Sequence, residues 1–402
     1  MEERLMPELR FPEFSGEWEQ RNLGEIVEYR NGNANEKNVV ADGKYNLITL
    51  NSIDIDGNLK QEHSRVDEAD WLLEKHDMVM VLSDIATGDF LGLTDLIPED
   101  NRYVLNQRMG LLRLKTEDNP TYIRTDINYN QRYFKSRGQG SSQQNLRKTD
   151  ILNYRISLPT LLEQQKISDF ILSIDEKLEL HRKRIEVLKE YKKGMLQGIF
   201  NRKIRFQDDD GEDYPEWEEK KFKSTLSKII DNRGKTPPTQ EEGIPLLEVN
   251  SLGDSKPRYS EVKKYVSQET YDNWFRDHIE QGDLLFSTVG RTGAVSIQDD
   301  EYAAIAQNIV GFRFENHNPM FMYYMLSNFD NWKKIKRIEM GAVQPSVKVT
   351  QMILLKFDIP SLPEQNKIAK FLSILDKRMK LEEEKLADLK RLKKGLIQKM
   401  FI

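Results

Sequence analysis

The 402-residue sequence contains no cysteine. This excludes a disulfide-stapled scaffold, a thiolate zinc site, an iron–sulfur cluster and a cysteine nucleophile. It also lacks any apolar run near the roughly 18 residues that a membrane span requires. The first residues, MEERLMPELRF, carry charges where a signal peptide needs an apolar core. We therefore expect no membrane segment and a cytoplasmic location.

Patterns typical of chemistry are missing as well. The five histidines are isolated, without the HxxxH or HExxH spacing of metal ligands. The stretch from Arg233 to Thr236 resembles the end of a phosphate-binding loop, but Ile229 stands where that loop needs a glycine. No glycine-rich loop suits AdoMet or a dinucleotide, and no carboxylate spacing singles out an acid/base pair. The sequence predicts no catalytic residue, no metal and no cofactor in this chain.

The composition predicts folded domains with separated charge. Apolar residues make up 38% and charged residues 32%, yet 17 Phe, 15 Tyr and 5 Trp suffice to build cores. The length predicts at least two domains. The net charge is −5, but residues 19–101 hold 7 basic and 18 acidic side chains, whereas residues 102–155 hold 11 basic and 4 acidic. Such separation allows a basic, nucleic-acid-binding face on an acidic protein, although ordinary solvated charge is the alternative.

The chain repeats itself at half its length. The segment from Leu158 to Phe200 aligns without a gap with that from Ile359 to Phe401, at an offset of 201 residues and with 16 of 43 positions identical. In both segments apolar residues follow a 4,3 spacing, with His181 and Lys192, or Glu382 and Lys393, in the same two polar positions. This pattern predicts two coiled-coil helices. Because they are copies of one unit, we expect them to pack antiparallel about a pseudo-twofold axis; ordinary bundle helices without a spacing role are the alternative.

Basic residues interleave with aromatic and amide side chains ahead of each helix. No acidic residue lies between Asn128 and Lys148. Arginine and lysine neutralise phosphates, whereas Gln, Asn and Arg can make paired hydrogen bonds to base edges. The second copy carries a similar basic stretch and a second polar glycine loop from Ser287 to Ala294. We therefore predict DNA contacts at Arg132, Lys135, Arg137, Gln139, Ser141, Gln143 and Asn145, and at Arg291, Lys333, Lys336, Arg337, Gln344, Ser346 and Lys348.

These features together resemble a known family. LPTLLEQQKISDFI and IPSLPEQNKIAKFL at the helix starts, KKGMLQGIF and KKGLIQKMF at their ends, and the GSSQQNL and GAVQPSV loops are similar to specificity (S) subunits of type I restriction–modification systems. YPEWEEKKF, RGKTPPT and LLEVNSL in the second half also match, so the resemblance covers essentially the whole chain. In the second loop Pro345 and Ser346 replace Gln144 and Asn145, and the family's base-reading residues do not transfer by motif.

The resemblance implies partners and a division of labour. Two target recognition domains would each read one half of a split target in double-stranded DNA. The helices would hold them apart and dock two methyltransferase (M) subunits, and restriction/translocase (R) subunits would complete the complex. The chain itself would be non-catalytic, with AdoMet, ATP and Mg in the partner subunits. The assembled complex would be a site-specific deoxyribonuclease and adenine methyltransferase.

The expected fold is α+β, with two similar target recognition domains separated by two long antiparallel coiled-coil helices in an internal pseudo-twofold repeat. The expected boundaries are 1–157 and 202–357 for the domains, and 158–201 and 358–402 for the helices. Two alternatives stay open: a structural adaptor whose globules bind proteins, and an enzyme with an unrecognised site. The sequence gives neither the DNA target nor its spacer length.

Overall fold

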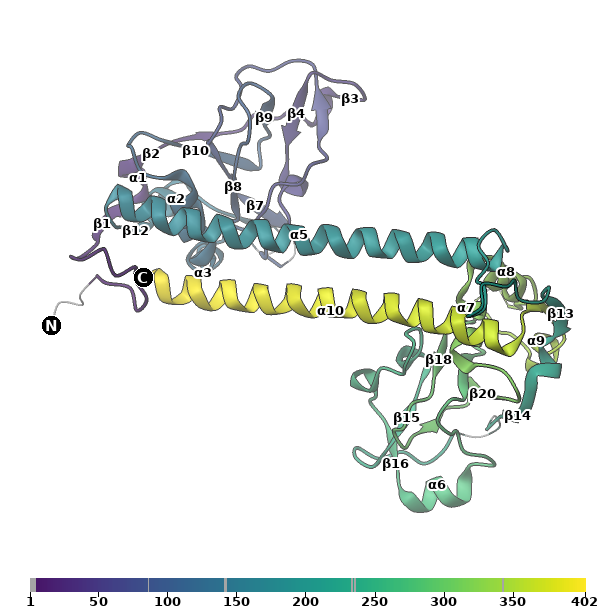
Figure 1. Ribbon diagram of the computed structural model, residues 1–402. Helices are drawn as coiled ribbons and strands as arrows, with labels where there is room; N and C mark the ends of the chain where they lie inside the picture. The colour runs from purple at the N-terminus through teal and green to yellow at the C-terminus, as the bar shows by residue number, and fades with distance from the viewer. Residues whose placement is uncertain (1–4, 86, 141–142, 233, 235, 342) are drawn as a thin grey trace. The chain divides into compact units, whose positions relative to one another are not determined.

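The computed structural model describes residues 5–85, 87–140, 143–232, 234, 236–341 and 343–402. The chain divides into two compact units, one of residues 1–181 with 385–402, the other of residues 182–384. Each unit thus holds one globule, the first part of the helix that follows it and the last part of the other long helix (Figure 1). None of the described helices is long and apolar enough to cross a membrane.

The described residues of the first globule, in unit 1, form short strands in four small sheets. The order of strands, with neighbours hydrogen-bonded, is β1 (Glu19–Asn22)–β12 (Arg155–Leu158); β2 (Val27–Asn31)–β10 (Met109–Leu114)–β6 (Met78–Val81)–β8 (Thr94–Leu96); β3 (Val39–Val40)–β5 (Ser64–Val66)–β4 (Tyr45–Ile48)–β9 (Tyr103–Leu105); and β11 (Gln143–Asn145)–β7 (Ser83–Ile85). Its helices are α1 (Leu23–Ile26), α2 (Pro120–Tyr129), α3 (Gln131–Lys135) and α4 (Lys148–Leu152), followed by the long α5 (Leu161–Phe200).

The second globule, in unit 2, repeats this plan. Its sheets are β13 (Glu218–Lys221)–β21 (Lys356–Ile359); β14 (Leu226–Ile230)–β20 (Ile309–Phe314)–β17 (Leu284–Ser287)–β18 (Val295–Ile297); and β16 (Tyr265–Val266)–β15 (Ile244–Leu247)–β19 (Ala304–Ile305). Its helices are α6 (Gln268–Trp274), α7 (Pro319–Ser327), α8 (Phe329–Arg337) and α9 (Val349–Met352), followed by the long α10 (Leu362–Met400). The central four-stranded sheets of both globules have the same strand order, and both globules pair one strand parallel, β4 with β9 and β15 with β19.

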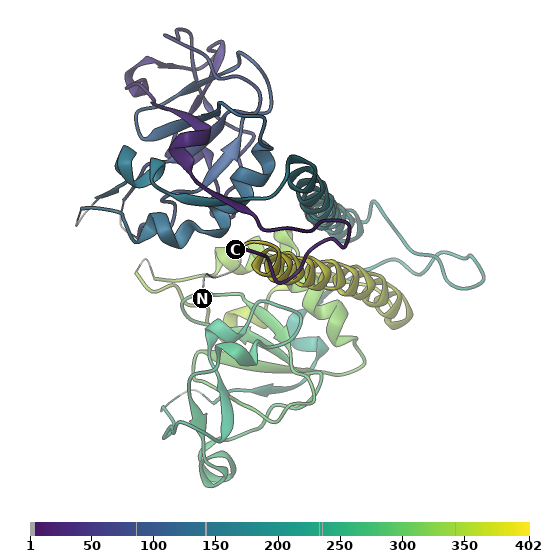
Figure 2. The same cartoon turned by 90° about the vertical axis from the view of Figure 1, so that its left-hand side faces the viewer.

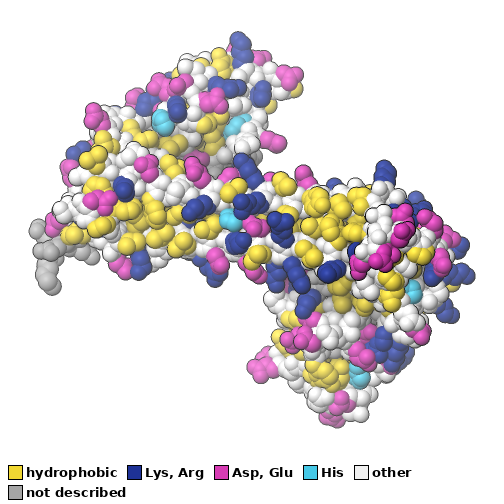
Figure 3. Space-filling model, viewed as in Figure 1, with side chains coloured by type: hydrophobic (Ala, Val, Ile, Leu, Met, Phe, Trp, Pro, Cys, Tyr) yellow, Lys and Arg dark blue, Asp and Glu magenta, His cyan; other side chains and the backbone are white. Residues whose placement is uncertain are grey.

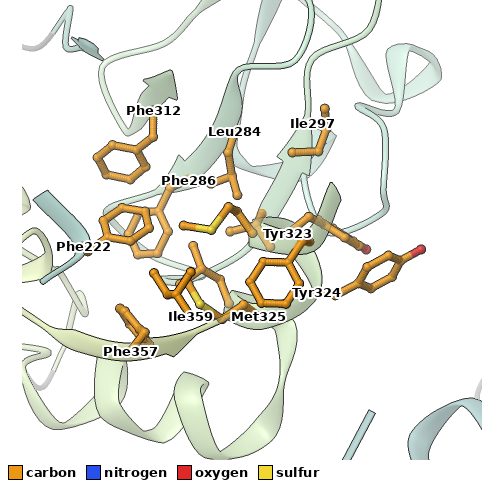
Figure 4. Packing of buried hydrophobic residues seen from close by; sticks show 14 of the residues in the cluster. Phe222, Leu284, Phe286, Ile297, Phe312, Tyr323, Tyr324, Met325, Phe357 and Ile359 are labelled. Carbon is orange, nitrogen blue, oxygen red and sulfur yellow. The ribbon is translucent and has the colours of Figure 1, made fainter. Parts of the chain in front are cut away.

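The core of the second globule lies between its central sheet and α7. Phe286 and Phe312 extend from adjacent strands into the same buried cluster as Tyr323 and Met325 of α7 (Figure 4). Phe222 packs edge-on against Phe312, with ring centroids 5.1 Å apart. All five side chains are at least nine-tenths buried. This apolar packing fixes α7, and with it the start of α8, on the sheet.

A repeated Glu-Gln pair joins each long helix to its globule. Gln164 accepts a hydrogen bond from the backbone N–H of Asn119 at 2.8 Å, and Gln365 accepts one from Asn318 at 2.9 Å. Each glutamine also donates to the carbonyl of the proline five residues before it. Both asparagines are N-caps, of α2 and α7, with proline at the first helical position. One amide therefore connects the long helix, its preceding turn and the cap of a globule helix.

The neighbouring glutamates anchor two equivalent extended segments. Glu163 is fully buried and accepts two hydrogen bonds of 2.7 Å from the guanidinium of Arg10. Glu364 is equally buried and accepts bonds of 3.1 and 3.2 Å from Arg205. In unit 1 the N-terminal segment also passes the end of α10, where the N–H of Leu9 donates to a carbonyl of the last helical turn at 2.7 Å (Figure 2).

The two long helices run antiparallel within each unit. In unit 1, Asp175 of α5 pairs with Lys393 of α10 at 2.5 Å. In unit 2, Lys192 of α5 pairs with Asp376 of α10. These pairs are related by the 201-residue repeat, so two of the polar positions in the seam carry reciprocal ion pairs, as expected for a pseudo-twofold arrangement. The predicted α+β fold with two similar domains and antiparallel long helices is confirmed.

Candidate nucleic-acid interface

The polar loop of the first globule is a β-hairpin. Gln139 and Asn145 exchange backbone hydrogen bonds of 3.1 and 2.9 Å, and Gly140 takes a φ of +122° in the turn between them. The returning strand β11 pairs antiparallel with β7. The Gln143 amide donates to Ser83 Oγ at 2.6 Å, which attaches the hairpin to the end of the central sheet. Of the predicted contact residues, Ser141 lies outside the described residues.

The basic residues before this hairpin differ in how they are engaged. Arg132 on α3 is exposed, and its side chain makes no hydrogen bond or ion pair with the described residues. Lys135 pairs with Asp89 at 2.6 Å, and this hydrogen bond lowers the pKa of the Asp89 carboxyl. Arg137 lies over the Tyr133 ring, 3.5 Å from its centroid. One cation is therefore available to a ligand, one braces the β7–β8 loop and one is held against an aromatic ring.

The second globule has the same hairpin at the 201-residue offset. Met340 and Ser346 exchange two backbone hydrogen bonds of 2.8 Å. Gly341 has a φ of +91°, like its counterpart in the first turn. Gln344 near the tip is exposed, and so is Lys348 where α9 begins; neither side chain has a partner among the described residues. The second hairpin therefore presents a free amide where its counterpart in the first hairpin, Gln143, is bound to Ser83.

The helix that precedes the second hairpin is also basic. On α8, Lys333 lies 4.1 Å from the ring centroid of Phe329 and within 3.6 Å of Asp330. Lys336 donates to Glu339 at 2.5 Å and to Thr292 at 2.9 Å. Arg337 is exposed and unpaired within the described part of the chain. As at Lys135, one lysine braces a neighbouring loop and leaves another cation open to solvent.

The glycine loop from Ser287 to Ala294 supports the second hairpin. The N–H of Gly290 donates to the carbonyl of Pro345 at 2.8 Å. Arg291, the predicted contact in this loop, is exposed, and its guanidinium lies over Gly253, about 3.1 Å from where a Cβ there would stand. The structure therefore brings all described residues of each predicted set onto one helix–hairpin–loop group, with Arg291 at its margin.

Sequence reasoning missed the acidic residues that brace each group. Asp89 holds Lys135, and Glu339 holds Lys336, although the two acids stand at unrelated positions of the repeat. No sequence signal marks them, because ion-pair partners are set by the fold rather than by spacing. Among the residues that the structure describes, no cluster of three His, Asp or Glu side chains could hold a metal ion.

Comparison with known proteins identifies the family. Residues 15–190 and 215–391 each match the model of the type I restriction modification DNA specificity domain. The chain is 21% identical over 404 residues to the type I restriction enzyme MjaVIII specificity subunit of Methanocaldococcus jannaschii, covering 97% of this chain and 92% of that one. It is 25% identical over 426 residues to the putative MjaX specificity subunit of the same organism, covering 96% and 93%.

Solved structures share the fold. The S subunit of a type I restriction–modification system from M. genitalium aligns with a TM-score of 0.64 at 16% identity, covering 99% of both chains. A chain from a study of complex assembly and conformational transition of the type I system aligns with a TM-score of 0.58 at 18% identity, covering 96% and 97%. With two matched domains, their repeated fold and relatives aligned along nearly their full length, the chain belongs to the family of type I restriction–modification specificity subunits.

Proposed function

We propose that each globule reads one half of a bipartite target in double-stranded DNA through its helix–hairpin–loop group. The observation that carries this proposal is the recurrence of the hairpin, Gln139 to Asn145 and Met340 to Ser346, each with an exposed, unpaired cation on the helix before it. Hairpins and helix ends are the elements that enter DNA grooves. Exposed cations position the protein on phosphates, whereas exposed amides can read base edges.

The internal hydrogen bonds sort the predicted contacts into two roles. Side chains that are braced by the protein shape the loops: Lys135, Gln143, Asn145, Lys336 and Ser346. Side chains that are exposed and have no partner among the described residues are the proposed DNA contacts: Arg132, Gln139, Arg337, Gln344 and Lys348. Arg137, Arg291 and Lys333 are exposed but partly engaged, and we propose that they contact phosphates.

We propose further that the long helices dock two M subunits, and that R subunits complete the complex. Apolar side chains are exposed on both helices (Figure 3), at positions related by the repeat: Leu180 is 48% exposed and Leu381 49%, while Tyr191 is 49% exposed and Leu392 54%. These residues lie outside the 4,3 seam. Equivalent exposed apolar sites favour two copies of one partner. In this proposal AdoMet, ATP and Mg belong to the partners, and the chain performs no chemistry.

The docking surface can be tested by pull-down. Replacing Leu180 and Leu381 together with Asp should abolish co-purification of the methyltransferase subunits, because two charges would be buried in apolar contacts. Ile55→Asp, at a site that is 60% exposed on the first globule, is the matched control and should retain both subunits. Retention of two methyltransferase subunits by the double variant would exclude this surface.

DNA reading is tested by one cation from each globule. Arg132→Ala with Arg337→Ala should weaken DNA binding by the complex and reduce its salt slope by up to about 0.9 per lost phosphate contact. The matched control replaces Arg102, paired with Glu99 at 2.9 Å, and Lys264, paired with Glu248 at 2.8 Å, because both are exposed cations with partners of their own. The control should leave the slope unchanged.

Sequencing the methylated sites in cells that carry the chain with its methyltransferase completes the test. The expected motif has two short half-sites separated by unread bases. A complex that assembles but shows no salt-sensitive DNA binding would favour the protein-binding adaptor instead.

A further inference from the structure

An open cavity lies in the first globule beside the reading hairpin. Its volume is about 490 Å³, and it is lined by Tyr133, Arg137, Thr149, Asp150, Asn153, Tyr154 and Arg155. Two stretches supply this wall, the end of α3 with Arg137 and the segment from α4 into β12, and the hairpin lies between them in the sequence. Arg137 stands two residues before Gln139, where the hairpin begins.

Two arginines, Arg137 and Arg155, line this cavity. Arg155 is exposed and has no ion-pair or side-chain hydrogen-bond partner among the described residues. Arg137 is held over Tyr133, and its Nη1 donates to the Tyr133 carbonyl at 3.2 Å. Because a guanidinium carries five N–H donors, the Nε and Nη2 groups of Arg137 remain available. An aromatic ring thus preorganises one arginine facing a cavity that a second arginine also lines.

The single carboxylate of the cavity has another role. Asp150 accepts a hydrogen bond from the backbone N–H of Arg147 at 3.2 Å, as part of the cap of α4. Two cations against one carboxylate leave the cavity net positive. Thr149 and Asn153 add a hydroxyl and an amide donor to the same wall. Paired guanidinium groups with neutral donors suit the tetrahedral oxyanion of a phosphate.

The second globule shows that the fold does not require this cavity. At the 201-residue offset, Ile338 stands for Arg137, Leu354 for Asn153 and Leu355 for Tyr154. Two cations stand at the equivalent positions, and both are engaged: Lys356, in place of Arg155, pairs with Glu219 at 2.7 Å, and Lys334, in place of Tyr133, donates to the carbonyl of Lys356 at 3.2 Å. Gln164, which joins the long helix to the globule, has a counterpart in Gln365, whereas the pair of arginines has none in the second globule. The arginine pair in the first globule therefore points to a ligand rather than to a requirement of the fold.

We propose that this cavity binds one phosphate of the DNA backbone that flanks the half-site of the first globule, clasped between Arg137 and Arg155. The inference rests on the proposed function and extends it to Arg155, on a strand 10 residues beyond the end of the hairpin. The clasp would set the register of the hairpin on the duplex without reading bases. The second globule would lack this contact, so the two half-sites would be held by unequal numbers of phosphates.

The test compares Arg137→Gln, Arg155→Gln, the double variant and the control Lys356→Gln in the complex of the full chain with its methyltransferase subunits. Salt slopes of DNA binding are measured for the methylated target and for a scrambled duplex. If both arginines hold one phosphate, each single variant should lower the slope by much less than 0.9, and the double variant by about 0.9, on both duplexes. Affinity should fall several-fold at ~0.15 M salt, the methylated motif should stay unchanged, and the control should match the wild type.

Other outcomes would overturn the clasp. Additive losses of about 0.9 for each arginine would mean two separate phosphates. A double variant with the wild-type slope and an unchanged melting temperature would place the cavity off the DNA. Titration of the chain with inorganic phosphate tests whether the cavity binds a free anion instead of a DNA phosphate. If the double variant loses phosphate binding but keeps the wild-type salt slope of DNA binding, the cavity is a site for a free anion. If the wild-type complex itself bound no DNA, the proposed function would fail rather than the clasp alone.

Discussion

The buried carboxyl of Asp126 predicts that the first globule loses stability as the pH rises through neutrality. Asp126 on α2 is 1% exposed. Its Oδ1 accepts a hydrogen bond from the Tyr154 hydroxyl at 2.5 Å, and its Oδ2 has no partner among the described residues. Burial raises the pKa of Asp126 to about 7, and the bond from Tyr154 offsets only part of that increase. Desolvation dominates because the charged form has lost its water.

The direction and the magnitude of this change in stability follow from the linkage between folding and proton binding. The pKa of Asp126 is about 7 in the folded state, against an ordinary value of 3.8, so the folded protein holds a proton over a pH range where the unfolded chain has released it. Stability from this group is therefore complete below about pH 4 and is lost as the pH rises through about 7. Three units of pKa correspond to roughly 4 kcal/mol in total, of which about 2 kcal/mol falls between about pH 5.5 and 8.5.

Asp126→Asn tests this reasoning, because the amide is neutral at every pH and keeps an oxygen for Tyr154. Hydrogen exchange in the first globule, measured at pH 5.5 and 8.5, should show the wild type losing about 2 kcal/mol more than the variant. The second globule is an internal control, because its α7 carries Met325 where α2 carries Asp126. Both positions are counted from the N-cap asparagines of the two helices, Asn119 and Asn318. If the wild type and the variant change in parallel across this range, Asp126 is ionised or solvated in the folded protein and the argument fails.

The remaining predictions concern the Arg10–Glu163 ion pair, the cofactor of the partner subunits and the length of the long helices. Arg10→Ala should destabilise unit 1 by about 3–5 kcal/mol, because it leaves the Glu163 carboxylate buried without its partner, and Glu163→Gln in the same chain should restore part of the loss; urea unfolding measures both. Titration calorimetry of the isolated chain with AdoMet should give no saturable heat at micromolar concentrations, whereas clear binding would contradict the assignment of that cofactor to partner subunits. Inserting four residues after Leu188 should shift the downstream helix by about 6 Å and 40°. We expect the unread spacer to change by one or two base pairs and both half-sites to persist; altered half-sites with the old spacer would contradict this division of labour.

The two long helices and their antiparallel pairing could be predicted from the sequence, because they depend on the spacing of apolar residues and on the internal repeat. The 4,3 spacing gave the two long helices, and the repeat gave their antiparallel pairing. The polar positions Lys192 and Lys393, which interrupt an apolar seam in sequence, are explained by their ion pairs to Asp376 and Asp175. Those carboxylates lie 184 and 218 residues from their partners. No local pattern reveals such pairing before the fold is known.

The candidate DNA interface was predicted only from the residue types in one stretch of the sequence. A stretch rich in Arg, Gln and Ser led to the prediction of DNA contacts, but it did not reveal which side chains are already engaged within the protein. Lys135 and Arg132 stand three residues apart and look equivalent in sequence, yet one is held by Asp89 and the other is free among the described residues. The cavity wall at Arg155 was missed for the same reason, because only the fold brings β12 beside the end of α3.

The two hairpins have the same backbone hydrogen bonds but different side chains. Each hairpin closes on a pair of backbone hydrogen bonds, between Gln139 and Asn145 in one globule and between Met340 and Ser346 in the other. Because backbone atoms make these bonds, the side chains at the closing positions can change from amide to thioether or hydroxyl without opening the hairpin. Hydrogen-bonding capacity toward DNA then differs between the copies while the hairpin stays the same. If the hairpins contact DNA as proposed, side-chain replacement within them would change the target and leave the helices and their buried Glu-Gln anchors intact.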